Sequence, residues 1–301
     1  MSAPAPALPV LAGAATGIFV GSTMVATRYV IGQTDPISLA LLRYAIGVLL
    51  LVPPVLLAAR VRFARADLLP IAALGIGQFG VLIALLNYGL QYIGSGLGAL
   101  IFTTFPLFTV GFGALWGHEL PSAAKTGGVL LTILGVGLAL GAKVLVPAGA
   151  GGAGVWLGVA AVFASAATGG LCSVLYRPYL RRYPPLHVGA FAMLASVLFL
   201  AVPAAAEGFF AALPTFTPGG WAAVVFIGAS SSAGYVLWLW ALKHSTPTRT
   251  SMFLALGPVT ATALGAALLD EPVTGLFLAG LACVAGGLWL AHWTPRAVGA
   301  K

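Results

Sequence analysis

Long apolar runs alternate with short polar connections along the whole chain. A helix needs about 20 apolar residues to cross a bilayer core roughly 30 Å thick, whereas the strands of a membrane barrel alternate in polarity over about 10 residues. The runs here are long and do not alternate, so they predict helices. We predict ten spanning helices, with bounds good to a few residues, at residues 8–31, 37–59, 68–93, 96–116, 123–142, 153–176, 186–206, 218–242, 247–269 and 273–293. The predicted fold class is an all-α integral membrane protein, in which each helix satisfies its own backbone groups.

The composition supports this prediction and excludes a soluble protein. Hydrophobic residues make up 60% of the 301 residues and charged residues only 7%, whereas soluble domains contain roughly 25% charged residues. So few charged groups cannot cover a water-facing surface of this size. In a soluble protein the net charge of +8 would suggest nucleic acid. Here membrane topology explains it better, so the lipid bilayer is a predicted partner and nucleic acid is not.

The basic residues lie mostly on one side of the predicted membrane. An even number of spans places both termini on the same side. Eleven of the 14 Lys and Arg residues lie in the connections on that side or in the C-terminal tail: Arg60, Arg62, Arg65, Lys125, Arg177, Arg181, Arg182, Lys243, Arg249, Arg296 and Lys301. Lys143 and Arg28 lie on the other side. Because Lys and Arg are enriched in cytoplasmic loops, we predict a multi-pass protein of the bacterial inner membrane with both termini cytoplasmic.

The stretch GIGQFG, residues 75–80, has the spelling of the phosphate-binding fingerprint of dinucleotide folds. It lies in the middle of the third predicted span, where no strand precedes it and no new helix begins, and the fingerprint requires both. We therefore interpret these glycines as sites of close helix packing. Gly13, Gly17 and Gly21 of the first span, at four-residue spacing on one face, indicate the same use of small residues.

A repeat relates the two halves of the chain. Six residues recur 152 positions later: Leu90, Pro106, Gly113, Glu119, Gly128 and Gly135 recur as Leu242, Pro258, Gly265, Glu271, Gly280 and Gly287. Gly21, Arg28 and Pro36 recur 149 positions later as Gly170, Arg177 and Pro185. Each half, 1–148 and 149–301, then holds five spans, so the second half enters the membrane from the opposite side. Inverted repeats are typical of alternating access around a midplane site; a duplication that only sets the fold is the alternative.

The C-terminal segment resembles a known family signature. Residues 238–291, from WLWALKHS to GGLWLA, are similar to the second repeat of the EamA family of the drug/metabolite transporter superfamily. The similarity rests on Ala241-Leu242-Lys243, Pro258, Glu271-Pro272 and the glycines of the last span. In the first half, LLRYAIGVLLL, which contains Arg43, and the segment 87–120 are similar to the corresponding motifs, although Gly89 stands where the family has Ala. Within the family the chain is most similar to YddG-type exporters of aromatic and other amino acids.

This resemblance implies ten helices around a central cavity. In the family, helices 3, 4, 8 and 9 mainly line the cavity, and helices 1, 2, 6 and 7 are the movable pieces. The resemblance also implies export of a small molecule, with no cofactor. The matching motifs are informative about the family but say little about the substrate, so export of other small metabolites or drugs is the alternative.

Polar and aromatic residues on the cavity helices are the candidate substrate-binding residues. In the eighth span, Ser231, Tyr235 and Trp238 follow i, i+4, i+7 spacing and share a helix face. The full set is Gln78, Asn87, Tyr88, Thr103, Phe105, Ser231, Tyr235, Trp238, Ser251 and Phe253. Aromatic faces with a few polar groups suit a small amphipathic ligand, so we predict amino acids, including aromatic ones, as substrates. For each aromatic residue, lipid contact is the alternative.

A second set of residues has predicted gating or structural roles: Gly21, Arg43, Pro106, Glu119, Gly170, Pro258 and Glu271. Arg43 is the one charge deep in a span, where charges are costly and usually functional; it is an anion partner, a gate element or a structural pairing. Glu119 and Glu271 lie at span ends before helices, where the dipole stabilises a carboxylate by ~0.3–1 kcal/mol. Capping is the favoured interpretation there, and a gate is the alternative. The glycines and prolines are predicted flexures.

Two other classes of function have weaker support. The segment HELPS, residues 118–122, lacks the second His of a zinc-protease motif, and no Asp-rich metal motif occurs, so we predict no catalytic residue and no enzyme. Cys172 and Cys283 lie inside apolar runs without disulfide or metal spacing, so no metal is predicted. A channel would need a filter-like element, and none is visible. The driving ion and the oligomeric state stay open, although a monomer is plausible.

Overall fold

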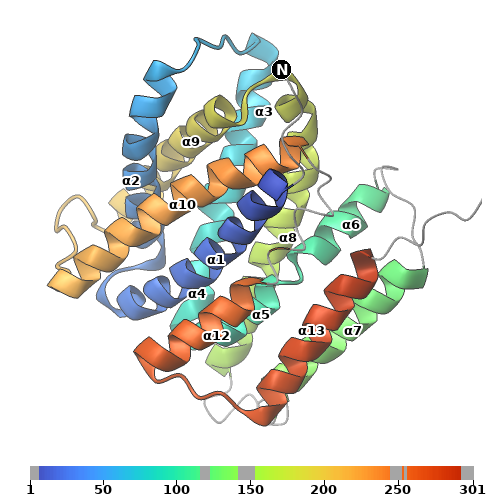
Figure 1. Cartoon of the computed structure of the whole chain (residues 1–301). Coiled ribbons are helices and arrows are strands. Elements are labelled where there is room, and N and C mark those ends of the chain that lie inside the picture. The colour runs from blue at the N-terminus through green and yellow to red at the C-terminus, as the bar shows by residue number, and fades with distance from the viewer. Residues whose placement is uncertain (1–6, 116–122, 142–152, 245–252, 254–255, 293–301) are drawn as a thin grey trace, which may run out of the picture.

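The computed structural model describes residues 7–115, 123–141, 153–244, 253 and 256–292, and these residues form helices and short connections without any strand. In chain order the elements are α1 (Ala7–Val30), η1 (Ile31–Gln33), α2 (Pro36–Leu57), α3 (Arg65–Gly75), η2 (Ile76–Val81), α4 (Leu82–Tyr92), α5 (Ser95–Phe102), α6 (Phe105–Leu115), α7 (Ala123–Leu140), α8 (Ala153–Arg182), α9 (Pro185–Ala206), α10 (Pro218–His244), α12 (Leu256–Leu269) and α13 (Gly275–His292). Figure 1 shows a bundle of crossing helices, with α7 and α13 side by side at one edge.

The helices have the length and the surface of a multi-pass membrane protein. Within the described residues, seven helices are long and apolar enough to cross a bilayer, and three shorter apolar helices accompany them. Large apolar side chains such as Leu57, Leu115 and Leu198 stand exposed on the outside of the bundle, as lipid-facing positions require. One predicted bound is wrong: α8 continues to Arg182 and does not end at residue 176. Arg181 and Arg182 in its last turn are favourable at a helix C-terminus, so the polar end of this helix extends past the apolar run.

The predicted third span is one continuous rod of α3, η2 and α4, but its centre is not α-helical. Residues Ile76–Val81 form a π-helix. This segment holds most of the GIGQFG stretch, and its glycines touch neighbouring helices: a Cβ at Gly75 would lie 2.7 Å from Ala192 Cα of α9, and one at Gly77 would lie 2.9 Å from Cys172 Sγ of α8. The packing interpretation of these glycines is confirmed, while the π-helix is a feature that periodicity did not predict. π-Helical segments are rare overall, but those that occur are often found at functional sites.

The predicted fourth span is broken just before Pro106. Helix α5 ends at Phe102 and α6 begins at Phe105, because proline has no N–H to donate and its ring clashes with the preceding turn. The two threonines at the break satisfy nearby carbonyls: Thr103 Oγ1 donates to Leu100 O at 2.5 Å, and Thr104 Oγ1 donates to Ile101 O at 2.8 Å. The break leaves two aromatic residues, Phe102 and Phe105, on the inside of the bundle.

Helices α7 and α13 pack against each other through reciprocal glycine contacts. A Cβ at Gly135 would lie 2.6 Å from Gly280 O, and a Cβ at Gly287 would lie 2.6 Å from Gly128 O. Gly128 and Gly280 are 152 residues apart, and so are Gly135 and Gly287. If one glycine contacts a second, the repeat counterparts of the two glycines also contact each other. This is the contact pattern of a two-fold interface. The contacts also run in opposite chain directions, so the two helices are antiparallel.

The same correspondence holds for α1 against α12 and α8 against α6. A Cβ at Gly21 would lie 2.8 Å from Thr260 Cβ and 3.0 Å from Ala261 N, and a Cβ at Gly170 would lie 2.6 Å from Phe108 Cβ and 2.9 Å from Thr109 N. Thr260 and Ala261 are 152 residues after Phe108 and Thr109. Small residues let the backbones approach closely in both places. Gly21 and Gly170 are thus packing points in this structure.

Polar contacts join chain connections at the two ends of the bundle. At one end, Asp67 of α3 accepts hydrogen bonds from Arg182 at 3.2 Å and from Tyr183 Oη at 2.7 Å, and the Tyr183 hydroxyl accepts one from Ala64 N at 3.0 Å. At the other end, Gln33 Oε1 accepts a hydrogen bond from Thr217 N at 3.0 Å. The connection between α2 and α3 therefore lies beside the connection between α8 and α9.

Candidate functional site

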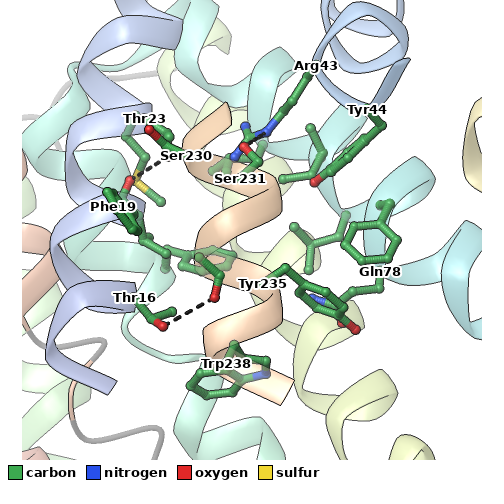
Figure 2. Close-up of a pocket in the computed structure, with 18 of the residues that line it drawn as sticks. Thr16, Phe19, Thr23, Arg43, Tyr44, Gln78, Ser230, Ser231, Tyr235 and Trp238 are labelled. Carbon is green, nitrogen blue, oxygen red and sulfur yellow. Dashed lines mark hydrogen bonds between the residues drawn. The ribbon is translucent and has the colours of Figure 1, made fainter. Parts of the chain in front are cut away.

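A small cavity lies at the centre of the bundle, where both halves of the sequence contribute side chains. Its volume is about 100 Å³. The described residues that line it come from the middle of α1 and α10, the first half of α2, the η2–α4 segment and the break between α5 and α6. They are Thr16, Phe19, Val20, Thr23, Met24, Arg43, Tyr44, Gln78, Phe79, Leu82, Ile83, Leu86, Phe102, Phe105, Ser230, Ser231, Gly234, Tyr235 and Trp238. Figure 2 shows these side chains converging from opposite walls.

Arg43 brings a positive charge to this cavity. The side chain is only 7% exposed, and its Nε donates a hydrogen bond of 2.6 Å to Ser231 Oγ, as Figure 2 shows. Ser231 is held in turn, because its hydroxyl donates to Ile227 O one turn earlier in α10. The guanidinium carbon lies 5.7 Å from the centre of the Tyr44 ring. The position of Arg43 is therefore fixed by α10 and by its own neighbour.

Aromatic rings form much of the rest of the wall. Phe79 packs edge-on against Tyr44 at 4.9 Å and against Tyr235 at 4.3 Å between ring centres. Phe105 packs edge-on against Trp238 at 5.9 Å. These separations and angles are the ones aromatic pairs prefer. The π-helix places Phe79 and the adjacent Gln78 at the cavity, so the irregular part of the third span is also the part that reaches the site.

Two buried polar atoms at this wall are poorly satisfied by the described residues. Gln78 Oε1 makes no hydrogen bond with any of them, and the Tyr235 hydroxyl has only the Tyr176 hydroxyl near it. Buried polar groups are normally paired, and each exception needs an explanation. Both atoms belong to residues that line the cavity. They are available to a ligand that offers hydrogen-bond donors or acceptors.

The structure separates the candidate residues into three groups. Gln78, Phe105, Ser231, Tyr235, Trp238 and Arg43 line the central cavity. Asn87, Tyr88, Thr103 and Phe253 do not line it, while Ser251 and Glu119 lie outside the described residues.

The candidates outside the lining have other contacts. Asn87 is fully buried and its Nδ2 donates to Pro36 O at 2.9 Å, which ties α4 to the start of α2. Tyr88 is 37% exposed and its hydroxyl pairs with that of Tyr92. Phe253 packs against Gly13 of α1.

The sequence reasoning missed the contribution of α1 to the cavity. Thr16, Phe19 and Thr23 line it from one face of this helix. Thr16 and Thr23 are seven residues apart, which is two helical turns, and this spacing of polar residues in an apolar helix was the available signal. The glycines Gly17 and Gly21, which the sequence analysis emphasised, lie on another face of this helix and pack against α12. A resemblance that assigned the lining mainly to helices 3, 4, 8 and 9 reinforced that omission.

Glu271 has a definite contact, although not at the helix that follows it. Its carboxylate accepts hydrogen bonds from Ser95 N at 2.8 Å, Ser95 Oγ at 2.8 Å and Gly96 N at 3.2 Å. These groups begin α5, so the carboxylate caps a helix of the other half of the chain. The dipole argument holds, but the prediction that Glu271 caps its own following helix is wrong. Pro258 lies in the first turn of α12, where proline is tolerated.

A wider hollow of about 1100 Å³ surrounds this contact at the end of the bundle where α1 ends. Arg28, Asp270 and Glu271 line it, together with Gln91 and Thr262. Arg28 Nη1 donates to Leu90 O at 2.8 Å and to Gln91 O at 3.1 Å, so its charge lies at the C-terminus of α4. The hollow is large and is lined partly by charged residues, whereas the central cavity is small and largely aromatic.

The chemical groups of the central cavity suit the binding of a small ligand. Among the described residues, no group of three His, Cys, Asp or Glu side chains could hold a metal ion. The central cavity combines a cation, an amide oxygen, hydroxyl groups and ring faces. At about 100 Å³ it is smaller than ligand pockets of roughly 300–1,000 Å³, so a ligand enters only if the surrounding helices or rings move.

Comparisons with known proteins place this geometry in context. Residues 7–141 and 153–293 each match the EamA-like transporter family. An uncharacterised transporter of Archaeoglobus fulgidus is 28% identical over 280 residues, covering 92% of this chain and 96% of that protein. A protein of Streptantibioticus cattleyicolor, named a probable terminal-alkyne amino-acid exporter, is 31% identical over 234 residues, covering 76% and 75%. A solved crystal structure aligns with a TM-score of 0.72 at 23% identity, covering 95% of this chain and 97% of that one; this likeness concerns the fold.

Proposed function

This chain belongs to the EamA-like transporter family, and we propose that it exports small metabolites, chiefly amino acids including aromatic ones, across the bacterial inner membrane by alternating access. The coarser part of this statement, a multi-pass membrane transporter, follows from the family and the apolar helices. The substrate, the direction and the mechanism are the proposal.

The proposed architecture is a pair of inverted five-helix repeats, 1–148 and 149–301. Two sets of contacts support it. The glycine contacts of α7 with α13 are reciprocal and antiparallel, and Gly21 and Gly170 touch residues that are themselves 152 apart. A two-fold axis in the membrane plane produces both. The three shorter apolar helices are counted as parts of spans in this proposal, which gives ten.

The observation that carries the proposed function is the central cavity between the two halves. It lies near mid-helix and is lined by α1, α2, the third and fourth spans and α10, which is where inverted-repeat carriers place their site. At about 100 Å³ the cavity requires its walls to move when a ligand enters, as alternating access also requires. The relative named as an amino-acid exporter supports amino acids as the substrate class. Arg62 and Arg181 lie at the end assigned to the cytoplasm, as the charge bias requires.

Flux through reconstituted protein tests the proposal. Proteoliposomes loaded with radiolabelled amino acids, one at a time, should show saturable, protein-dependent efflux for at least one of them. Vesicles prepared from the same lipids without protein are the control. If sound vesicles release none of the amino acids faster than the control, the substrate class is wrong. Ohmic single-channel current in a planar bilayer would instead identify a channel.

A further inference from the structure

We propose that the central cavity selects ligands that bear a carboxylate, and that Arg43 is the residue that binds it. This inference deepens the proposed function and rests on it for the location of the site. It adds a selection for the carboxylate over the amine and a role for Arg43 that similarity to the family does not supply.

The first argument is that the charge of Arg43 has no counter-charge among the described residues that line the cavity. None of the described residues that line the cavity is acidic. The single hydrogen bond described for its guanidinium is the one from Nε to the neutral Ser231 hydroxyl. An arginine presents five N–H donors in a planar fork, so most of that capacity is unused within the described part of the chain. A buried cation is costly unless it is paired, and a carboxylate fits the arginine fork in a bidentate manner.

The second argument is that the fold does not require a cation at this position. By the 149-residue offset that relates Pro36 to Pro185, the counterpart of Arg43 is Ala192 of α9. Ala192 is fully buried and packs directly against Gly75 of the third span. The equivalent place in the other half is thus filled by a methyl group in a closed interface. Arg43 thus differs from its counterpart Ala192 at a position that faces the cavity. We take this difference to indicate a role in ligand binding and not in the scaffold.

The third argument is that the neighbouring groups suit the rest of such a ligand. The Tyr44 ring lies 5.7 Å from the guanidinium carbon, and Phe79 packs edge-on against both Tyr44 and Tyr235, so that the three rings form an aromatic wall. Among the described residues Gln78 Oε1 has no hydrogen-bond partner and the Tyr235 hydroxyl has only the Tyr176 hydroxyl near it, and Figure 2 shows both side chains at the cavity. An amide oxygen accepts hydrogen bonds from an ammonium group, so an amino acid satisfies the carboxylate and the amine at once. Of these two ligand groups, the carboxylate is the one that would pair with a formal charge of the protein, the Arg43 guanidinium.

The test compares three probes that share one aromatic ring: phenylalanine, phenylpropionate, which lacks the amino group, and phenethylamine, which lacks the carboxylate. Binding is measured as the shift in the thermal unfolding midpoint of purified full-length protein in detergent. We expect phenylalanine and phenylpropionate to stabilise the wild type and phenethylamine not to. In Arg43→Gln, the apparent affinity for both carboxylates should fall about 10- to 100-fold, the range for a hydrogen bond to a charged group.

Two variants separate ligand binding from a structural role. Arg65→Gln removes the same charge at the start of α3, outside the cavity lining, and should bind all probes as the wild type does. Ser231→Ala removes the tie between α2 and α10 but keeps the cation, so it should retain the preference for carboxylates. Arg43→Lys retains charge without the fork and should bind carboxylates with intermediate affinity. If Arg43→Gln fails to fold, Arg43→Lys and Ser231→Ala still decide the question.

Several results would overturn the inference. Equal stabilisation of the wild type by phenethylamine and phenylpropionate would do so, as would an unchanged carboxylate affinity in the Arg43 variants or no stabilisation by any probe. Flux distinguishes this failure from failure of the proposed function. Carboxylate binding without transport would leave the subsite standing and refute the transporter proposal. Amino-acid flux that is unchanged in Arg43→Gln would leave transport standing and refute the subsite.

Discussion

At the scale of single residues, the buried hydroxyl groups of Tyr235 and Tyr176 show what the cavity adds to the fold. Both are buried with no close hydrogen-bond partner among the described residues other than each other, and their rings lie 6.4 Å apart. Only Tyr235 lines the cavity. An unpartnered buried hydroxyl costs stability, and that cost is recovered on ligand binding only where a ligand reaches it. The two tyrosines therefore form a natural pair of test and control.

Removing the Tyr235 hydroxyl should separate stability from transport. Tyr235→Phe deletes a buried polar group whose one close neighbour among the described polar groups is the Tyr176 hydroxyl, so the unliganded protein should gain about 1 kcal/mol or stay unchanged. If the hydroxyl meets the substrate, KM for flux should rise about 3- to 10-fold. Thermal unfolding and proteoliposome flux measure the two effects. Tyr176→Phe should give the same stability result with unchanged KM, and a raised KM in that variant as well would contradict the assignment.

The sequence predicted about a third of the residues that line this site, and the reasons why it missed the others are physical. Ser231, Tyr235 and Trp238 were accessible because one helix face carries them at regular spacing. Asn87 was indistinguishable from them, since a buried amide that pairs with a carbonyl of α2 has the same sequence signature as one that faces a cavity. Tyr44 and Phe79 reach the wall because of tertiary packing and the π-helix, and neither follows from periodicity.

At the scale of elements, the tip between α4 and α5 is held by opposite charges at opposite helix ends. Arg28 donates to the last carbonyls of α4, and Glu271 accepts from the first amides of α5. A cation at a helix C-terminus and an anion at an N-terminus are each favoured by the helix dipole. The two side chains come from α1 and from the connection between α12 and α13, so this tip ties three parts of the bundle together.

Loss of the Glu271 carboxylate should loosen that tip. Glu271→Ala removes three hydrogen bonds to a charged acceptor in a partly open hollow, and we expect a loss of about 1–3 kcal/mol of stability. The thermal unfolding midpoint in detergent measures it. Asp270→Asn is the matched control, because it removes a carboxylate charge from the residue that precedes Glu271. Asn tolerates the positive φ of 52° at this position. Equal destabilisation by both variants would refute a specific role for the Glu271 contact.

The packing of α7 on α13 predicts opposite effects for two glycines two residues apart. Gly135→Ala places a methyl group against Gly280 O and Val284 of α13, so overpacking should cost about 1–3 kcal/mol. A Cβ at Gly137 meets nothing within 4 Å, so Gly137→Ala should stabilise α7 by about 0.5–1 kcal/mol. Unfolding midpoints of the two variants test the pair. A loss of stability in Gly137→Ala equal to that in Gly135→Ala would mean that this face of α7 is not open.

The elements themselves were largely predictable, and their interruptions were not. Apolar run length gave most helix bounds to within a few residues, because the bilayer fixes the length. The extension of α8 to Arg182 escaped it, since the last turns of that helix are polar. The break at 103–104 follows from Pro106 and was predicted only as a flexure. The π-helix in GIGQFG has no reliable sequence signal; three glycines marked the place without specifying the geometry.

At the scale of the whole molecule, the two ends of the bundle carry different contacts that fit one two-fold arrangement. The connection between α8 and α9 meets the connection between α2 and α3 through Tyr183 and Asp67. At the other end, the connection between α1 and α2 meets the segment before α10 through Gln33 and Thr217. Pro36 and Pro185 open the corresponding helices α2 and α9. The connections that meet at one end are thus the repeat counterparts of the connections that meet at the other end, as an inverted repeat requires.

Labelling from the two faces of the membrane tests this arrangement together with its orientation. On a background of Cys172→Ala and Cys283→Ala, the variants Arg62→Cys, Arg181→Cys and Thr215→Cys each place one thiol in an exposed position of a connection or a helix end. A membrane-impermeant maleimide should label the Thr215→Cys variant in intact bacterial cells, and the other two only in inverted vesicles. Residues 62 and 181 must give the same result because the hydrogen bond between Ala64 N and the Tyr183 hydroxyl holds their connections together. Labelling of positions 62 and 181 from outside the cell would reverse the proposed orientation. Labelling of the two positions from opposite faces would require an odd number of spans between them. The inverted five-plus-five arrangement places an even number there, so that result would refute it.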